Sequence, residues 1–206
     1  MSPRLEPLSR GTLQSAPTVC HSCVWWQARG GKSVNKKRWI DLAEESWGPW
    51  GMIYVDDDKR LLGVMQYGSA FLFPRSQKLP AGPASADAVL VTCAYLVDSA
   101  SPWVIQSLFL AAAGEVRSRG AEALEAFAYR YGEEDDFEER LICHRAIFPH
   151  DLLADLGFVT IREAGRVQLA RLELGGLDPC AEAEPGLIAR LKRFYLPAPL
   201  PVPPRP

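Results

Sequence analysis

The sequence lacks any apolar run that reaches the roughly 20 residues a membrane span needs. Its first thirty residues contain scattered Arg, Pro and Ser but no apolar stretch. We therefore expect no secretory signal peptide and no membrane partner. An excess of charge of one sign is also lacking, because 23 Lys and Arg stand against 25 Asp and Glu, for a net charge of −2. Because the chain carries no excess of positive charge, we expect no nucleic-acid partner.

Cysteine is too scarce, and odd in number, for a disulfide scaffold in 206 residues. We therefore expect a reduced, cytoplasmic protein. What the chain does contain is ordinary globular chemistry, with 48% hydrophobic, 10% aromatic and 23% charged residues, enough for one good core. The five cysteines are Cys20, Cys23, Cys93, Cys143 and Cys180.

Hydrophobic periodicity and turn residues predict a mixed order of strands and helices. The apolar run 88–97 is typical of a strand buried on both faces. With the helix and strand that follow, it predicts a right-handed βαβ unit. The expected elements are strands at 3–9, 51–55, 61–73, 88–97, 123–129, 158–162 and 167–174, and helices at 33–47, 102–119, 149–156 and 184–195.

Composition divides the chain into four parts. We expect an N-terminal segment at 1–30 with the first strand and the Cys pair, a main domain at 31–176, a C-terminal amphipathic helix at 177–196 and a Pro-rich disordered tail at 197–206. The acidic run 133–139 favours a solvated loop, with attraction of a cationic amine substrate as the alternative.

The element order, together with local motifs, resembles the GNAT superfamily of acetyl-CoA-dependent N-acyltransferases. The strand 88–97 with its following helix resembles the family's fourth strand and cofactor helix, and 123–127 its fifth strand. The segment 152–158, ending in Gly-Phe, is similar to its late short helix. The segment Cys-His-Ser-Cys-Val-Trp-Trp at 20–26 resembles a bacterial branch of such proteins. The resemblance covers roughly residues 3–175.

This resemblance implies an α/β (α+β) fold: a mixed, mostly antiparallel central sheet with flanking helices, and a cleft where the fourth and fifth strands splay apart. Acyl-CoA is expected in that cleft, with its pantetheine on the fourth strand and its pyrophosphate at the N-terminus of the next helix. Unsatisfied amides and the helix dipole favour an anion there. The implied cofactor contacts are Tyr95, Leu96, Val97, Val104, Ile105 and Gln106.

The phosphate-binding loop departs from the family pattern. Ser101 stands at the Gln/Arg position, Val104 at the first Gly and Gln106 at the last position, so the signature is degenerate. Ser101 followed by Pro102 is instead typical of a well-capped helix that binds no phosphate. Two interpretations stay open here: phosphate binding through backbone amides alone, or no phosphate binding.

The family's usual acid, a tyrosine, falls on Leu153. Tyr95 and Tyr129 are the candidate replacements, and Glu125 is the candidate base. The alternatives are core packing for the two tyrosines and an outward-facing strand position for the carboxylate.

A zinc site is the chief other chemistry that we considered. Cys20 and Cys23 have metal-ligand spacing, and Cys143 with the adjacent His144 could complete a tetrahedron. Because two adjacent ligands give awkward geometry, we expect no zinc. Redox chemistry of the Cys pair and packing of the neighbouring tryptophans are the alternatives, and Cys93 is expected to be a small buried hydrophobe.

The basic run 36–38 is interpreted as a solvated helix face, with a contact to the CoA 3′-phosphate as the alternative. Together these features predict an N-acetyltransferase acting on an unidentified amine of a small molecule or protein, as a monomer or homodimer. The alternative is a GNAT-fold binding or regulatory module that has lost efficient CoA use.

Overall fold

A computed structural model describes residues 4–29, 33–97, 102–132 and 146–175. These described residues all belong to one compact unit. The expected helix at 184–195, the tail at 197–206 and the acidic run at 133–139 lie outside the described residues.

The described elements follow the expected order. The strands are β1 (Arg4–Pro7), β2 (Gly51–Val55), β3 (Leu61–Ser69), β4 (Ala88–Leu96), β5 (Ala123–Tyr129), β6 (Phe148–Pro149), β7 (Val159–Ala164) and β8 (Val167–Glu173). The helices are α1 (Thr18–Ser22), α2 (Lys36–Ser46), α3 (Pro102–Ser118) and α5 (His150–Asp155), with short 3₁₀ turns at Leu13–Ser15, Ala70–Leu72 and Pro74–Lys78. The sequence did not predict α1, β6 or the 3₁₀ turns, and the strand expected at 61–73 ends at Ser69.

These strands form one mixed sheet in the order β1-β2-β3-β4-β5-β8-β7, with β6 also paired to β5. The pairs β4–β5 and β5–β6 are parallel, and the other pairs are antiparallel. The parallel β4–β5 pair joined by α3 is the βαβ unit that the sequence predicts. The expected fold class, mixed and mostly antiparallel with flanking helices, is therefore confirmed.

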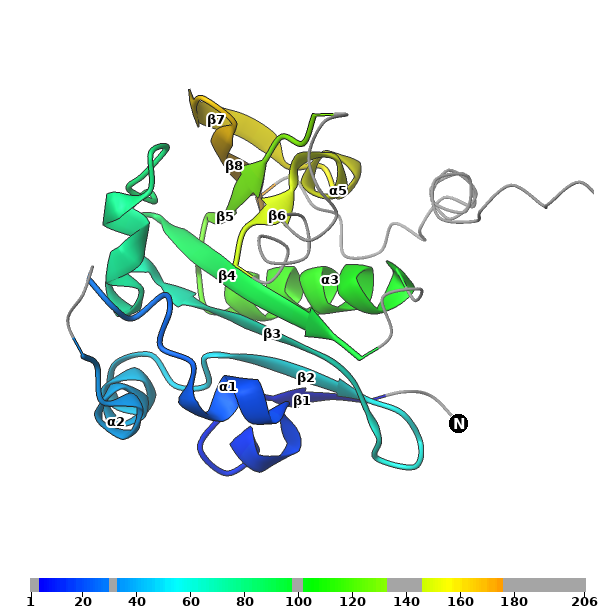
Figure 1. Ribbon diagram of the computed structural model, residues 1–206. Helices are drawn as coiled ribbons and strands as arrows, with labels where there is room; N and C mark the ends of the chain where they lie inside the picture. The colour runs from blue at the N-terminus through cyan, green and yellow to red at the C-terminus, as the bar shows by residue number, and fades with distance from the viewer. Residues whose placement is uncertain (1–3, 30–32, 98–101, 133–145, 176–206) are drawn as a thin grey trace, which may run out of the picture. The chain divides into compact units, whose positions relative to one another are not determined.

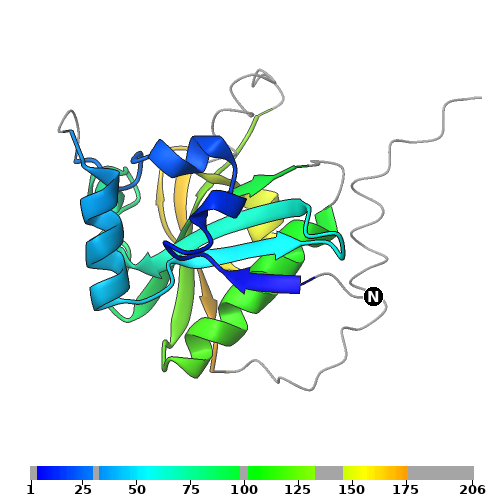
Figure 2. The ribbon, with the colours of Figure 1, turned by 90° about the horizontal axis from the view of Figure 1, so that it is seen from below.

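Helices cover both faces of the sheet, with α3 on one face and α1 and α2 on the other (Figures 1 and 2). The apolar stripe of α3, including Val104 and Leu108, packs into one core cluster. Trp39 and Ile40 of α2 pack into the second cluster, on the opposite face. Alternate strand residues feed the two clusters because successive side chains of a strand point to opposite faces.

The burial of residues changes along the length of β4. Its residues 88–92 are buried, as the sequence predicts for a strand covered on both faces. The prediction is wrong for 93–97, which are partly or fully exposed. The reason is that β4 runs beside β5 only in its first half.

Candidate functional site in the gap beside β4

The two central strands separate at a β-bulge. β4 and β5 pair from Ala88–Ala123 to Val91–Ala126 and no further. On the other edge of β4, Gln66 pairs with Cys93 while the next β3 residue pairs with Val91, so Thr92 is an extra residue. A bulge bends its strand and re-aims the side chains that follow it. The expected splay between the fourth and fifth strands therefore has a local cause at Thr92.

The bulge also decides which β4 side chains face which helix. Val91 and Ala94 pack with the α3 cluster, whereas Cys93 and Tyr95 pack with the α2 cluster. The hydroxyl of Thr92 donates to the carbonyl oxygen of Gln66 at 3.1 Å, which fixes the extra residue in the buried sheet. Without the extra residue, strand alternation would turn Cys93 and Tyr95 toward α3 instead.

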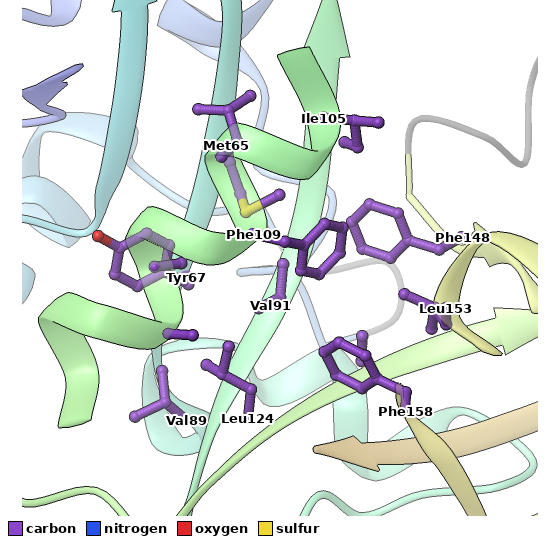
Figure 3. Close-up of a cluster of buried hydrophobic side chains, with 14 of the residues drawn as sticks. Met65, Tyr67, Val89, Val91, Ile105, Phe109, Leu124, Phe148, Leu153 and Phe158 are labelled. Atoms are coloured by element: carbon purple, nitrogen blue, oxygen red, sulfur yellow. The ribbon is translucent and has the colours of Figure 1, made fainter. Parts of the chain in front are cut away.

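Beyond the bulge, β6 instead of β4 pairs with this edge of β5. Phe148 and Pro149 pair with the last two residues of β5. The ring of Phe148 lies 5.2 Å from that of Phe109 of α3, and Phe158 lies 5.6 Å from the same ring. Figure 3 shows these three rings together with Leu153. On the α3 face, the gap is therefore filled by an aromatic cluster.

The second half of β4 keeps an edge without a strand partner among the described residues. The Val97 amide donates to the Leu62 carbonyl at 3.0 Å, one step beyond the Gly63–Leu96 pair. In an antiparallel pair, residues whose backbone groups bond across the pair alternate with residues whose groups point away. Ala94 and Leu96 therefore direct their N–H and C=O groups toward the gap, while the amide of Val97 is used within the sheet.

The side chains at the start of α3 turn away from the gap or into the core. Trp103 packs edge-on against Tyr54 of β2, with ring centres 5.6 Å apart. Since β2 and β5 lie on opposite sides of β4 in the sheet, this ring packs away from the gap. Val104 and Ile105 are buried, and Gln106 is partly exposed.

The N-terminus of α3 offers few groups to a phosphate. Its first residue, Pro102, has no N–H, so Trp103 and Val104 supply the free amides of the first turn. Gly63 lets this turn approach the sheet, since a Cβ there would stand 2.9 Å from Val104 Cγ1. Ser101, at the Gln/Arg position of the loop, lies outside the described residues. Among the described residues, phosphate binding here would depend on two amides and the helix dipole, because the first turn contains no glycine and no basic residue.

A pocket of about 230 Å³ opens on the opposite face, beside the second half of β4. Its walls are mostly apolar and include three tryptophans. Ala94 from β4 and Ala146 just before β6 both line it, so the pocket reaches the gap between these strands. The lining residues are Leu8, Leu13, Val19, Cys20, Cys23, Trp25, Trp26, Gln27, Lys36, Trp50, Val64, Gln66, Cys93, Ala94, Tyr95 and Ala146.

Lys36, the first residue of α2, is the charged residue among these lining positions. Its ammonium donates to the Cys23 carbonyl at 2.9 Å and lies 4.5 Å from the ring centre of Trp39. Burial lowers the pKa of Lys36, and nearby cysteines oppose that shift in part. The prediction of a solvated face for 36–38 holds for Lys37 and Arg38, which are exposed, and is wrong for the half-buried Lys36.

Three of the thiols lie around the same pocket. Cys20, Cys23 and Cys93 form no disulfide with one another and line it. Burial raises the pKa of the Cys93 thiol to about 12. Cys93, which the sequence predicts to be a small buried hydrophobe, is partly buried against the α2 cluster and also lines the pocket. Within 4–29, 33–97, 102–132 and 146–175, no group of His, Cys, Asp or Glu is arranged to hold a metal, and Cys143 lies outside these residues.

The candidate catalytic residues are not brought together. Tyr95 lines the pocket. Tyr129 lies at the end of β5, with its ring 4.9 Å from that of Tyr131. Leu153, at the position of the family's usual acid, is buried in the α3 cluster.

Glu125 is fully buried, so the outward-facing alternative is wrong. Its carboxylate accepts the Ser85 amide at 2.7 Å and pairs with Arg171 of β8 at 3.2 Å. The same guanidinium contacts Asp87 and Glu173 at 2.8 and 2.6 Å. These contacts hold Glu125 in an ion-pair network and away from the pocket lining.

The strand order, the separation of β4 from β5 and the α3 crossover define a GNAT-like fold. No protein-family model matches the sequence, and no curated protein matches it. No helix in the described parts of the chain is long and apolar enough to cross a membrane.

Solved structures to which the chain is similar include three N-acetyltransferases. The ribosomal-protein-S18-alanine N-acetyltransferase of Escherichia coli has a TM-score of 0.47 at 10% identity, covering 88% of this chain and 99% of that one. An N-acetyltransferase of Staphylococcus aureus Mu50 has a TM-score of 0.48 at 12% identity, over 84% and 99%. Mutant forms of the spermidine/spermine N-acetyltransferase SpeG of Vibrio cholerae have a TM-score of 0.49 at 12% identity, over 84% and 95%.

Proposed function

We propose that the chain is an acyl-CoA-dependent N-acyltransferase that works in the gap between β4 and β6. The observation that carries this proposal is the open backbone edge of β4 beyond the Thr92 bulge, which borders the pocket. Ala94 and Leu96 offer N–H and C=O groups to the amides of a pantetheine chain, as another strand would. Residues of the same segment line the pocket, so a thioester on that edge would lie beside a space for the acceptor amine.

The reaction needs a nucleophile, an exit for the thiolate and protection from water. The amine nitrogen attacks the thioester carbonyl and gives up a proton to water, the C–S bond breaks, and the thiolate takes a proton. Tyr95 lines the pocket within this β4 segment, so we propose that its hydroxyl supplies that proton. The apolar walls keep the reacting groups away from bulk water.

Two variants of Ala94 test the proposed cofactor edge. Ala94→Pro removes an N–H that points away from β3, where an edge strand tolerates proline. Losing one hydrogen bond, worth about 0.5–1.5 kcal/mol, weakens acetyl-CoA binding roughly 2- to 12-fold. Ala94→Gly keeps the N–H and is the matched control, with affinity unchanged within about twofold. Equal affinity of both variants would place the cofactor elsewhere.

Turnover is measured as release of free CoA from acetyl-CoA with a panel of amines, separated by chromatography. A thiol reagent is unsuitable because Cys23 is itself an exposed thiol. Tyr95→Phe, which keeps the ring, is expected to lower kcat about 10²-fold or more with little change in acetyl-CoA affinity. An unchanged kcat would remove Tyr95 from the mechanism.

The second candidate function is a GNAT-fold binding module without acyl transfer. The observation that favours it is the pairing of β6 with β5, which fills the α3 side of the gap with Phe148. The absence of an N–H at Pro102 points the same way. Failure to bind acetyl-CoA would support this module over the enzyme.

A further inference from the structure

The pocket beside β4 combines apolar walls with one cation. Trp25, Trp26 and Trp50 line it, and none of the described residues that line it is Asp or Glu. Within the described parts of the chain, Lys36 forms no ion pair with a carboxylate, and the titratable groups that influence it are cysteines. A half-buried ammonium without a counter-charge is a site of positive potential.

The position of Lys36 on its helix strengthens this potential. Lys36 begins α2, where the dipole places its positive end, and the first turn contains no acidic residue. An ammonium has three N–H donors, and the Cys23 carbonyl takes one of them. Among the described residues, no other hydrogen-bond acceptor takes the remaining two donors, and the Trp39 ring centre lies 4.5 Å from the ammonium.

We infer that this pocket binds a small apolar molecule carrying a carboxylate, which pairs with Lys36 while the apolar body packs against the tryptophans. The volume of about 230 Å³ lies below the roughly 300 Å³ typical of the smallest drug-sized sites, so the ligand is small. A polyamine is disfavoured, because it carries no carboxylate and, among the described lining residues, would meet a lysine and no Asp or Glu. If the chain transfers acyl groups, an acceptor amine in this pocket therefore also carries a carboxylate. The inference depends on the pocket alone and stands whether or not the chain transfers acyl groups.

The test uses three probes that share one ring system and differ in charge: 2-naphthoate, 2-naphthalenemethanol and 2-naphthylmethylamine. Each is titrated into the full chain by calorimetry at pH 7.5 without acyl-CoA, so that failure here is separate from failure of the proposed acyl transfer. We expect the carboxylate to bind at least tenfold more tightly than the alcohol, and the amine to bind most weakly.

Lys36→Met removes the charge and keeps a long apolar side chain. We expect it to remove the preference for the carboxylate while leaving the alcohol within about threefold. Binding of the alcohol also shows that the variant pocket is intact. Lys37→Met is the matched control, since Lys37 is exposed next to Lys36; it should behave as the unmodified chain.

Three outcomes would overturn the inference. The carboxylate and the alcohol could bind equally, which would leave an apolar pocket only. Lys37→Met could lose as much affinity as Lys36→Met, which would indicate general surface charge. If none of the three naphthyl probes binds, the pocket is too narrow for this class of ligand.

Discussion

The ion pair between Glu125 and Arg171 gives the sharpest stability prediction. Glu125 is fully buried and its partner is also largely covered, with a side-chain exposure of 13% for Arg171. Arg171→Met leaves the carboxylate buried without its counter-charge, which costs about 3–5 kcal/mol. For a chain of this size 1 kcal/mol shifts Tm by roughly 2–4 °C, so we expect a fall of about 6–20 °C.

A double-mutant cycle separates this effect from lost packing. Glu125→Gln removes the charge and keeps an oxygen that can accept the Ser85 amide. We expect the Glu125→Gln/Arg171→Met double variant to recover at least half of the Tm lost by Arg171→Met, measured by circular dichroism. Glu173→Gln, at an exposed partner of the same guanidinium, is the control and should change stability by less than about 1 kcal/mol.

The result also decides the role of Glu125. If Arg171→Met costs less than about 1 kcal/mol, or if the double variant is no more stable, the carboxylate is not held by this pair. Glu125 would then again be a candidate for the catalytic base. A large loss with recovery would identify Glu125 as a structural residue.

Three further predictions follow from single positions. Gly63→Ala crowds the first turn of α3 and should destabilise the chain by about 1–3 kcal/mol, whereas Gly114→Ala, with nothing within 4 Å, should not lower its Tm. Iodoacetamide at pH 8 should label the exposed Cys23 well before Cys93, whose pKa is raised to about 12; equal labelling by peptide mass spectrometry would refute this. Burial raises the pKa of the Tyr67 hydroxyl in the folded chain, so the hydroxyl loses its proton at a lower pH in the unfolded chain than in the folded chain. The free energy of unfolding should therefore fall above about pH 10. Tyr67→Phe should make this fall smaller, as measured by denaturant titrations at several pH values.

Long elements were predictable from sequence because their patterns are local. The apolar run of β4 and the 3.6-residue stripe of α3 identify the central βαβ unit directly. The segment α1 has five residues and β6 two, which is too short for a periodicity. The bulge at Thr92 has no sequence signal of its own, since it appears only in the pairing with β3.

The site was harder to predict because distant segments build it. Glu125 meets Arg171 across neighbouring strands, 46 residues apart in the chain. The pocket joins Leu8 to Ala146, so no single stretch of sequence indicates it. Lys36 looked like one of three solvated basic residues, and its contact with the Cys23 carbonyl and its place in the pocket lining are visible only in the structure. Tyr95, which the sequence indicates as a candidate acid and cofactor contact, lines the pocket, and its role stays a prediction.

Acetyl-CoA binding tests the central claim most directly. Calorimetric titration of the purified chain with acetyl-CoA, after metal analysis of the same sample, measures whether the β4 edge and the two α3 amides hold the cofactor. The account predicts micromolar binding that Ala94→Pro weakens and Ala94→Gly does not. No binding at millimolar acetyl-CoA would contradict the acyltransferase proposal and leave a GNAT-like binding module.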